Sequence, residues 1–349
     1  MTHADGNTGF HIRRSRLIAI IAVLLPFSFF AALALGTISI PITDTVNALL
    51  SGASATQSEL VVKQIRLPRA LLATLVGALL GIAGATTQGL FRNPLADPSL
   101  IGVTAGASAG AALAIFFAGK VMSLTGFSGL GVVSTGAFLG GSIAVMTVYT
   151  LATNRNATSV ATMLLAGIAI TAIAGSLTSL LEFFADNEML RRISLWKMGG
   201  LDGANYQRVA IIALFSAIIL FVLPRYATAL NALLLGESEA RHLGLSVQKI
   251  KMRLILLVAA AVGVSVALAG TIAFIGLVVP HIIRLIIGPD HRYLLPTSAL
   301  GGAILLLLSD TVARTAFAPI ELPVGLVTAL LGAPFFISLL RHRHDFGMR

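Results

Sequence analysis

Long apolar segments that alternate with short polar ones run through most of the chain. A helix needs about 20 predominantly apolar residues to cross the hydrocarbon core of a bilayer. Windows close to that length fall near residues 17–36, 68–88, 99–119, 130–151, 158–184, 208–224, 252–270, 271–287, 294–312 and 322–340. The pattern predicts an all-α polytopic membrane protein with ten transmembrane helices. Only Gly270–Thr271 separates the seventh and eighth windows, so one long kinked helix is the alternative there.

The composition excludes a soluble globular protein. Hydrophobic residues make up 56% of the 349 residues and charged residues 11%, whereas a soluble domain carries about 25% charged residues. Ten spans leave no room for a second large domain. We therefore expect a cytoplasmic tail at 1–16, a single transmembrane domain at 17–340 and a cytoplasmic tail at 341–349. The sequence has no cysteine, so neither a disulfide framework nor a thiolate metal site can form.

The distribution of positive charge predicts the orientation in the membrane. If the N-terminus is cytoplasmic, most of the 24 lysines and arginines fall on the cytoplasmic side, together with both termini. Cytoplasmic loops normally carry this excess. The net charge of +10 is spread over short loops, which fits contact with membrane lipid better than binding of nucleic acid. Leu17–Gly36 is longer than the apolar core of about 7–15 residues in a signal peptide, so we interpret it as a retained first span.

Glycines repeat at helical spacing in two of the windows. Such stripes let helix backbones approach closely in a membrane, where lipid provides no hydrophobic drive for association. They support a packed bundle and indicate no particular function. Their positions are Gly77, Gly81 and Gly84 in the second window, and Gly102, Gly106 and Gly110 in the third.

The longest polar stretch on the predicted cytoplasmic side runs through residues 224–251. Within it, at 229–250, a short predicted helix with several charged residues lies between Gly236 and Gly244. Two interpretations are open at this point. The helix lies on the lipid surface as an amphipathic element, or it docks a cytoplasmic partner.

No motif for chemistry is present in the sequence. There is no GxxxxGK[ST] segment to cradle nucleotide phosphates, and no nucleophile and base pair or metal-ligand cluster. We therefore expect no catalytic site, no cofactor and no metal in this chain. His281 is the only histidine within an apolar run, and we interpret it as structural. An ion-coupled secondary transporter is the alternative from another class, but such proteins keep ionisable groups near the bilayer centre, and Glu182 and Asp310 lie near span ends.

Several separate motifs resemble one family, the permease subunits of ATP-binding-cassette importers for iron siderophores, haem and vitamin B12. The resemblance covers about residues 60–340. It is carried by QIRLPRALLATLVGALLGIAG at 64–84, QGLFRNPLADPSLIGVTAGA at 88–107, LWKMGGL at 195–201, LLLGESEARHLGL at 233–245, AGTIAFIGLVVPHIIRLIIGPDHRYLLP at 269–296 and ELPVGLVTALLGAPFFISLL at 321–340. It implies a type II importer permease fold in the bacterial inner membrane. The implied assembly is a homodimer with two ATPase subunits, which bind the ATP, and a periplasmic substrate-binding protein.

The resemblance also implies roles for individual positions. External arginines dock acidic residues of the binding protein, which here are Arg66, Arg69 and Arg314. The alternatives are that Arg66 and Arg69 anchor a helix end at the headgroups and that Arg314 pairs with Asp310. The coupling segment would orient the ATPase through its charged residues and bury Leu243 and Leu245 against it. Its implied contact residues are Gly236, Glu237, Glu239, Ala240, Arg241, Leu243 and Gly244.

The resemblance places the translocation pathway along the fifth and tenth spans. Small and weakly polar residues of the fifth span are the candidates, and packing between helices is their alternative role. They are Ser159, Thr162, Gly167, Thr171, Gly175, Ser176 and Thr178. The family's cytoplasmic gate lies near the start of this span, where Val160 and Ala161 stand here.

The wording of three segments, 191–206, 288–296 and 318–325, is most similar to haem permeases. We therefore expect haem as the cargo, with a ferric siderophore or cobalamin as alternatives. Arg191, Arg192 and Lys197 would face outside and attract haem propionates or a siderophore carboxylate equally well.

Overall fold

The fold is a bundle of helices, known from a computed structural model that describes residues 4–50, 56–117, 129–154 and 158–341. Within these ranges the regular elements are helices, with a single isolated antiparallel bridge between Thr153 and Thr158. All ten predicted windows fall on helices. These are α1 (Ala4–Ala34), α4 (Leu67–Leu90), α5 (Val103–Phe116), α7 (Gly129–Ala152), α8 (Val160–Phe184), α10 (Tyr206–Val222), α13 (Val247–Ala269), α14 (Ile275–Ile287), α15 (His291–Thr315) and α16 (Val324–Arg341).

The helices differ in length. Six helical segments of the described chain are long and apolar enough to cross a membrane, and they contain α4, α7, α8, α10, α13 and α15. The apolar helices at Ala19–Ala34, Val103–Phe116, Ile275–Ile287 and Val324–Ser338 are shorter. The all-α class is therefore confirmed, and the number of ten spans stays a prediction. α1 begins at Ala4, so residues 4–16, expected as a tail, continue the first helix.

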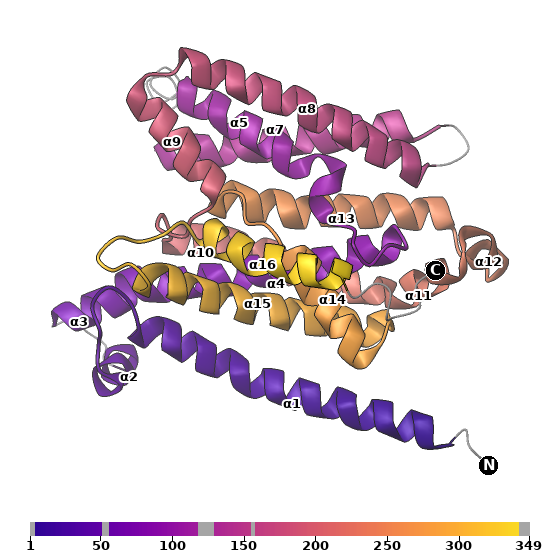
Figure 1. The fold of residues 1–349 in the computed structure, drawn as a ribbon, viewed down its shortest axis with the longest axis horizontal. Helices are drawn as coiled ribbons and strands as arrows, with labels where there is room; N and C mark the ends of the chain where they lie inside the picture. Colours follow the sequence, from indigo (N-terminus) through magenta and orange to yellow (C-terminus); the bar gives the residue numbers. More distant parts are fainter. Residues whose placement is uncertain (1–3, 51–55, 118–128, 155–157, 342–349) are drawn as a thin grey trace.

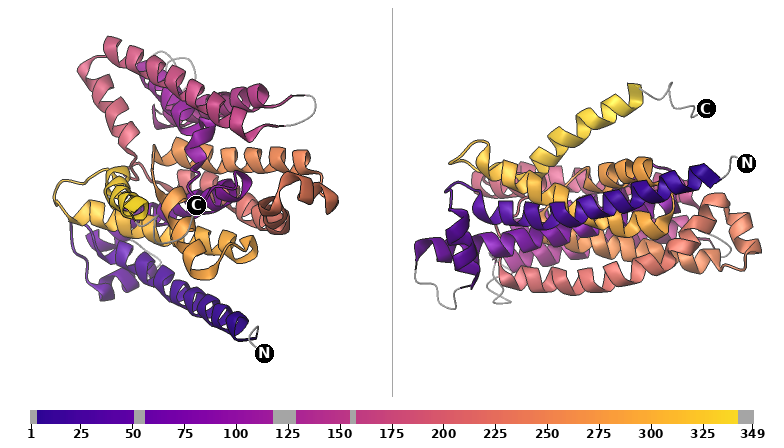
Figure 2. Two further views of the ribbon diagram at one scale, coloured as in Figure 1. Left: turned by 45° about the vertical axis from the view of Figure 1, so that its right-hand side comes forward. Right: turned by 90° about the horizontal axis from the view of Figure 1, so that it is seen from below.

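Short helices lie at both ends of the bundle (Figure 1). α2 (Ile42–Leu50), α3 (Gln57–Leu60) and α9 (Asn187–Met198) lie at one end. α11 (Ala227–Leu235) and α12 (Glu237–His242) lie at the other. α1 begins and α16 ends toward the α12 end, which Figure 2 shows from two further sides. The start of α1, the end of α16 and α12 thus lie toward the same end of the bundle, and the side of the membrane that this end faces stays a prediction.

α4 is the central helix, buried on nearly every side. Its glycines allow the neighbouring backbones to reach it. A Cβ on Gly77 would lie 2.3 Å from the carbonyl oxygen of Gly302 on α15, and one on Gly84 would lie 1.8 Å from that of Gly276 on α14. Gly106 and Gly110 of α5 pack in the same way against α7. The prediction that the glycine stripes are helix contacts is therefore confirmed for these positions.

Irregular backbone lies at the start of the third predicted span and between the seventh and the eighth. The third window begins with a 3₁₀ turn, Pro98–Ile101, that Asp97 caps and that ends at Gly102 with a φ of 79°. α13 and α14 are separated by residues 270–274, with positive φ at both Gly270 and Phe274, so the alternative of one kinked helix is wrong. A cavity of about 410 Å³ lies between these two breaks.

Candidate functional site

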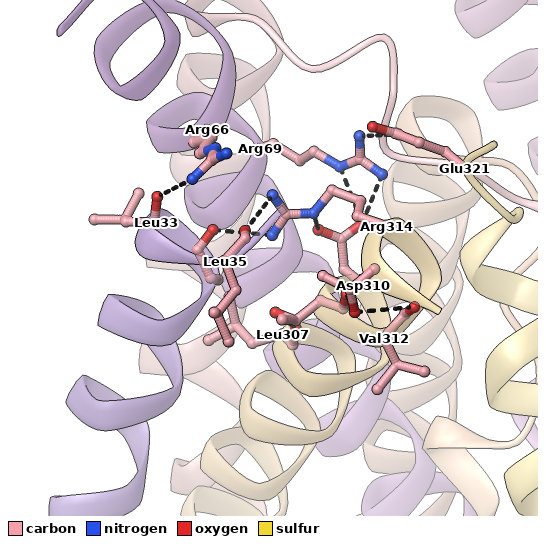
Figure 3. Close-up of polar contacts among 12 residues, drawn as sticks. Leu33, Leu35, Arg66, Arg69, Leu307, Asp310, Val312, Arg314 and Glu321 are labelled. Atoms are coloured by element: carbon pink, nitrogen blue, oxygen red, sulfur yellow. Dashed lines mark hydrogen bonds and ion pairs between the residues drawn. The ribbon is translucent and has the colours of Figure 1, made fainter. Parts of the chain in front are cut away.

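The three arginines expected to dock a partner come together at the end of the bundle opposite α12 (Figure 3). Arg66 ends a π-helical turn, Val61–Arg66, that leads into α4. Arg69 follows in the first turn of α4, and Arg314 lies in the last turn of α15. Their exposed fractions are only 4%, 7% and 4%. We name Arg66, Arg69, Arg314, Asp310 and Glu321 the arginine cluster.

Two carboxylates neutralise part of the charge of the arginine cluster. Asp310, which is 1% exposed, lies 2.9 Å from Nη2 of Arg69 and 3.1 Å from Nε of Arg314. Nη1 of Arg69 also donates to Glu321, at 2.6 Å, across the loop that precedes α16. The expected alternative of a local pair between Arg314 and Asp310 is therefore present. Because Asp310 serves two buried guanidinium groups, its loss would leave both with too few partners.

The cluster also contacts the end of α1 and the residues that follow it. Arg66 donates through Nη1 to the carbonyl oxygens of Leu33, at 2.8 Å, and Ala34, at 2.6 Å. Arg314 donates through Nη2 to the carbonyl oxygen of Ala32, at 2.9 Å. The last carbonyls of a helix have no partner within it and carry partial negative charge, so a guanidinium group is a suitable cap. Gly36 follows directly, and a Cβ there would lie 2.9 Å from Nη2 of Arg66.

The geometry gives the three arginines internal partners, which the sequence-based expectation of external docking did not include. Arg66 holds the end of α1 through the carbonyl oxygens of Leu33 and Ala34, and anchoring of a helix end at the lipid headgroups stays the alternative. Within the cluster, Glu321 is the most exposed side chain, at 37%. Docking of a binding protein by Arg66, Arg69 and Arg314 stays a prediction, and a partner carboxylate would have to compete with Glu321 for Arg69.

The predicted coupling helix is present as α12. Glycines with positive φ stand at both ends, 126° at Gly236 and 83° at Gly244, which is backbone that other residues rarely adopt. Ala240 is fully buried against the bundle, whereas Glu239 and Arg241 are exposed. α12 therefore presents a polar outer side while one small residue fixes it to the protein.

Two residues of the coupling segment bear on the expected contact with the ATPase. Leu243, expected to provide burial in a partner, is 64% exposed in this single chain. Glu237 was expected among the charged residues that orient the ATPase, but its carboxylate turns inward, where Oε1 lies 2.8 Å from Nζ of Lys251. The reason is that Lys251 is buried on α13 and needs a counter-charge.

Lys251 is the feature that the sequence analysis missed. It is 2% exposed and lies on the buried face of α13 with Val247, Ile250, Leu254 and Val258. Besides Glu237, its ammonium group donates to the backbone carbonyl of Thr158. The signal in the sequence was a lysine that interrupts an apolar face at helical spacing.

The candidate pathway residues of α8 divide into two groups. Gly167 and Thr178 are buried, since a Cβ on Gly167 would lie 1.9 Å from the carbonyl oxygen of Leu100 and Thr178 donates to the carbonyl of Ala174 at 2.9 Å. Both fit the packing alternative. The other five candidates are exposed on this single chain: Ser159, Thr162, Thr171, Gly175 and Ser176. Ser159 caps α8 by accepting from the backbone N–H of Thr162.

Positive charge near the arginine-cluster end is partly paired. In and beside α9, Lys197 lies 3.1 Å from Glu182, and Arg192 pairs with Glu188. Arg191 is exposed. His281 is 4% exposed and packs edge-on against Phe335, in agreement with a structural role. Among the described residues, no group of three or more His, Asp or Glu side chains could hold a metal ion.

Comparison with known proteins shows what the chain is similar to. A model of the FecCD transport family matches residues 11–342. The hemin transport system permease protein HmuU of Yersinia pestis is 46% identical over 283 residues, 80% of this chain and 83% of that protein. The cobalamin import system permease protein BtuC of Halobacterium salinarum is 44% identical over 291 residues, 82% and 74% of the two chains. The vitamin B12 import system permease protein BtuC of Salmonella typhi is 43% identical over 284 residues, 81% and 84%.

Two solved structures have a similar fold. One is described as an inward-facing conformation of a metal-chelate type ABC transporter. It matches with a TM-score of 0.81 and 33% identity over 94% of this chain and 99% of that one. The other, PsaBC from Streptococcus pneumoniae in complex with Fab, matches with a TM-score of 0.54 and 16% identity over 80% and 92% of the two chains. At that identity the second match speaks for the fold alone.

Proposed function

This chain belongs to the FecCD transport family, and we propose that within this family it carries haem from a periplasmic binding protein across the bacterial inner membrane. It is a permease subunit of an ATP-binding-cassette importer, and ATP hydrolysis belongs to a separate ATPase subunit. The observation that carries the choice of haem is the 46% identity to a hemin permease over 80% of the chain. The sequences of residues 191–206, 288–296 and 318–325, which resemble haem permeases, also support haem as the cargo.

Cobalamin is the second candidate for the cargo, because two cobalamin permeases are 44% and 43% identical over a similar share of the chain. A ferric siderophore is the third, since the resemblance noted in the sequence includes siderophore permeases. The positive charges of this chain do not indicate which of these ligands is carried. Arg191 is exposed and could attract any anionic cargo, whereas Lys197 and Arg192 already have carboxylate partners.

Transport would proceed by alternating access at the interface of a homodimer. The exposed side of α8 carries Ser159, Thr162, Thr171 and Ser176 among apolar residues, a surface that allows a bulky ligand to slide without strong binding. α16 would complete the pathway. The ATPase would contact α12 through Glu239, Arg241 and Leu243, which are exposed. The ten-span topology with cytoplasmic termini is part of the proposal. It is supported by the start of α1 and the end of α16, which lie toward the same end of the bundle as α12.

Uptake by proteoliposomes tests the proposed function. They would contain the permease with its ATPase, and the binding protein would be supplied with haem, with cobalamin or with a ferric siderophore, with and without ATP on the ATPase side. ATP-dependent accumulation of haem is the expected result. Uptake of only another ligand would keep the mechanism and change the cargo. Uptake that does not need ATP would contradict the importer mechanism and favour an ion-coupled transporter.

A further inference from the structure

We propose that Lys251 is a positioning residue that links α12 to the start of α8, so that displacement of α12 moves the cytoplasmic mouth of the pathway. The inference rests on the proposed function, in which the ATPase acts on α12. It concerns how a displacement of α12 is transmitted to the helices of the bundle. The three residues of the link are Glu237 on α12, Lys251 on α13 and Thr158 before α8.

The first half of the link joins α12 to α13. Nζ of Lys251 lies 2.8 Å from Oε1 of Glu237, and the lysine side chain is 2% exposed while that of Glu237 is 28% exposed. An ammonium group at such a site is costly to leave without its carboxylate. The two helices are therefore expected to move together at this point rather than to separate.

The second half joins α13 to the segment in front of α8. Both backbone polar groups of Thr158 form hydrogen bonds with side chains of α13. Its carbonyl oxygen accepts from Lys251, and its N–H donates to Oε1 of Gln248, at 2.9 Å, one turn earlier on α13. The next residue, Ser159, caps α8, and its own N–H donates to the carbonyl of Ala152 at the end of α7.

The sequence of contacts thus runs without a gap from the ATPase-facing helix to the first turn of a pathway-lining helix. Glu237, Lys251 and Thr158 belong to three separate parts of the chain, 14 and 93 residues apart from the lysine. Glu239 and Arg241 of α12 are exposed and take no part in this link. Ala240, which is fully buried, also fixes α12 in place, but its methyl side chain cannot form an ion pair or a hydrogen bond with α13 or α8.

A purely structural role of Lys251 is the competing explanation, and the two make different predictions. If Lys251 only stabilises the fold, its loss lowers the yield or the melting temperature, and the protein that remains folded transports normally. If it links α12 to α8, folded and assembled protein hydrolyses ATP but transports poorly. The ratio of cargo moved to ATP hydrolysed separates the two roles, because it does not depend on the amount of folded protein.

The test compares Lys251→Met with Arg253→Met, which removes one positive charge from an exposed position two residues later on α13 and outside the coupling segment. Glu237→Gln breaks the same ion pair from its more exposed side, so it addresses the link if Lys251→Met folds poorly. Each variant is reconstituted with the ATPase and haem-loaded binding protein. We expect a drop of roughly tenfold in haem moved per ATP for Lys251→Met and Glu237→Gln, and no change for Arg253→Met. Lys251→Arg should restore part of the ratio because it keeps the charge.

A second readout does not depend on the cargo. The chain has no cysteine, so Thr162→Cys gives one spin label in each subunit at the start of α8. In the otherwise unchanged protein, trapping the ATPase with nucleotide should shift the distance between the two labels. Lys251→Met should abolish this shift while the ATPase still copurifies. If Lys251→Met shows the same label shift and the same transport ratio as Arg253→Met, the inference is overturned. If the protein that carries only Thr162→Cys shows no change in the distance between the labels when nucleotide is added, the proposed function itself is contradicted.

Discussion

Several charged residues of this protein are buried, and Arg69, Asp310 and Lys251 are among those that form ion pairs. Asp310 shows what this means for stability, because its two oxygens serve Arg69 and Arg314 at once. We expect Asp310→Asn to lower the free energy of unfolding by about 3–5 kcal/mol, since breaking a buried ion pair leaves an uncompensated charge. Thermal unfolding of the purified protein in detergent would measure it.

Glu321→Gln provides the matched control, because it removes one carboxylate charge from the same cluster at a partly exposed position. Solvent screens such a pair, so the expected loss is about 1 kcal/mol or less. Equal destabilisation by the two variants would contradict the view that burial, rather than the number of contacts, decides the importance of these charges.

Sequence analysis identified Arg66, Arg69 and Arg314 as a set but not their contacts. The partners lie far along the chain: Asp310 is 241 residues from Arg69, and Glu321 is 252 residues from it. No local pattern encodes such a pairing. Lys251 was missed for a related reason, since a lysine near a predicted cytoplasmic end is typically explained by membrane orientation.

At the scale of whole helices, the apolar windows predicted the elements well because bilayer-spanning helices must satisfy their own backbone hydrogen bonds and expose apolar side chains. The same argument gave no information on α2, α3 and α9, which are short and lie at the end of the bundle. The exact starts of helices also depended on local backbone. α5 begins at Val103 rather than with its window, because Gly102 takes up a left-handed conformation.

Contacts between helices make a clear prediction at this scale. Gly84→Ala should destabilise the bundle by about 1–3 kcal/mol or more, because the new Cβ would lie 1.8 Å from the backbone oxygen of Gly276, which no side-chain rotation can relieve. The fraction of protein that elutes as a single species after solubilisation, together with its melting temperature, would report the effect.

The control for this change is Gly175→Ala on α8, where a Cβ would meet no atom within 4 Å. Its effect on the stability of the subunit should stay within about 0.5 kcal/mol, as for exposed substitutions in general. If Gly175 lines the pathway or a dimer contact, transport would change while subunit stability does not. Comparable instability of the two variants would show that these helices do not pack as described.

For the whole molecule, the important fact is that its two ends carry different chemistry. One end holds the arginine cluster with α2, α3 and α9, and the other holds α12 with the start of α1 (Figure 1). In an importer the binding protein and the ATPase must act on opposite sides of the membrane. Because the arginine cluster and α12 are separate, the proposed binding-protein contact and the proposed ATPase contact can be tested independently of each other.

Reversal of the exposed charges on α12 is therefore expected to act on one partner only. In Glu239→Lys with Arg241→Glu, like charges would face each other at the ATPase contact, which costs several kcal/mol at an interface. Copurification of the ATPase should fall roughly tenfold or more, while binding protein should still bind the permease. Both side chains are exposed, so the fold should be unaffected. Loss of binding-protein affinity without loss of the ATPase would reverse the assignment of the two ends, because the charges on α12 would then face the periplasm.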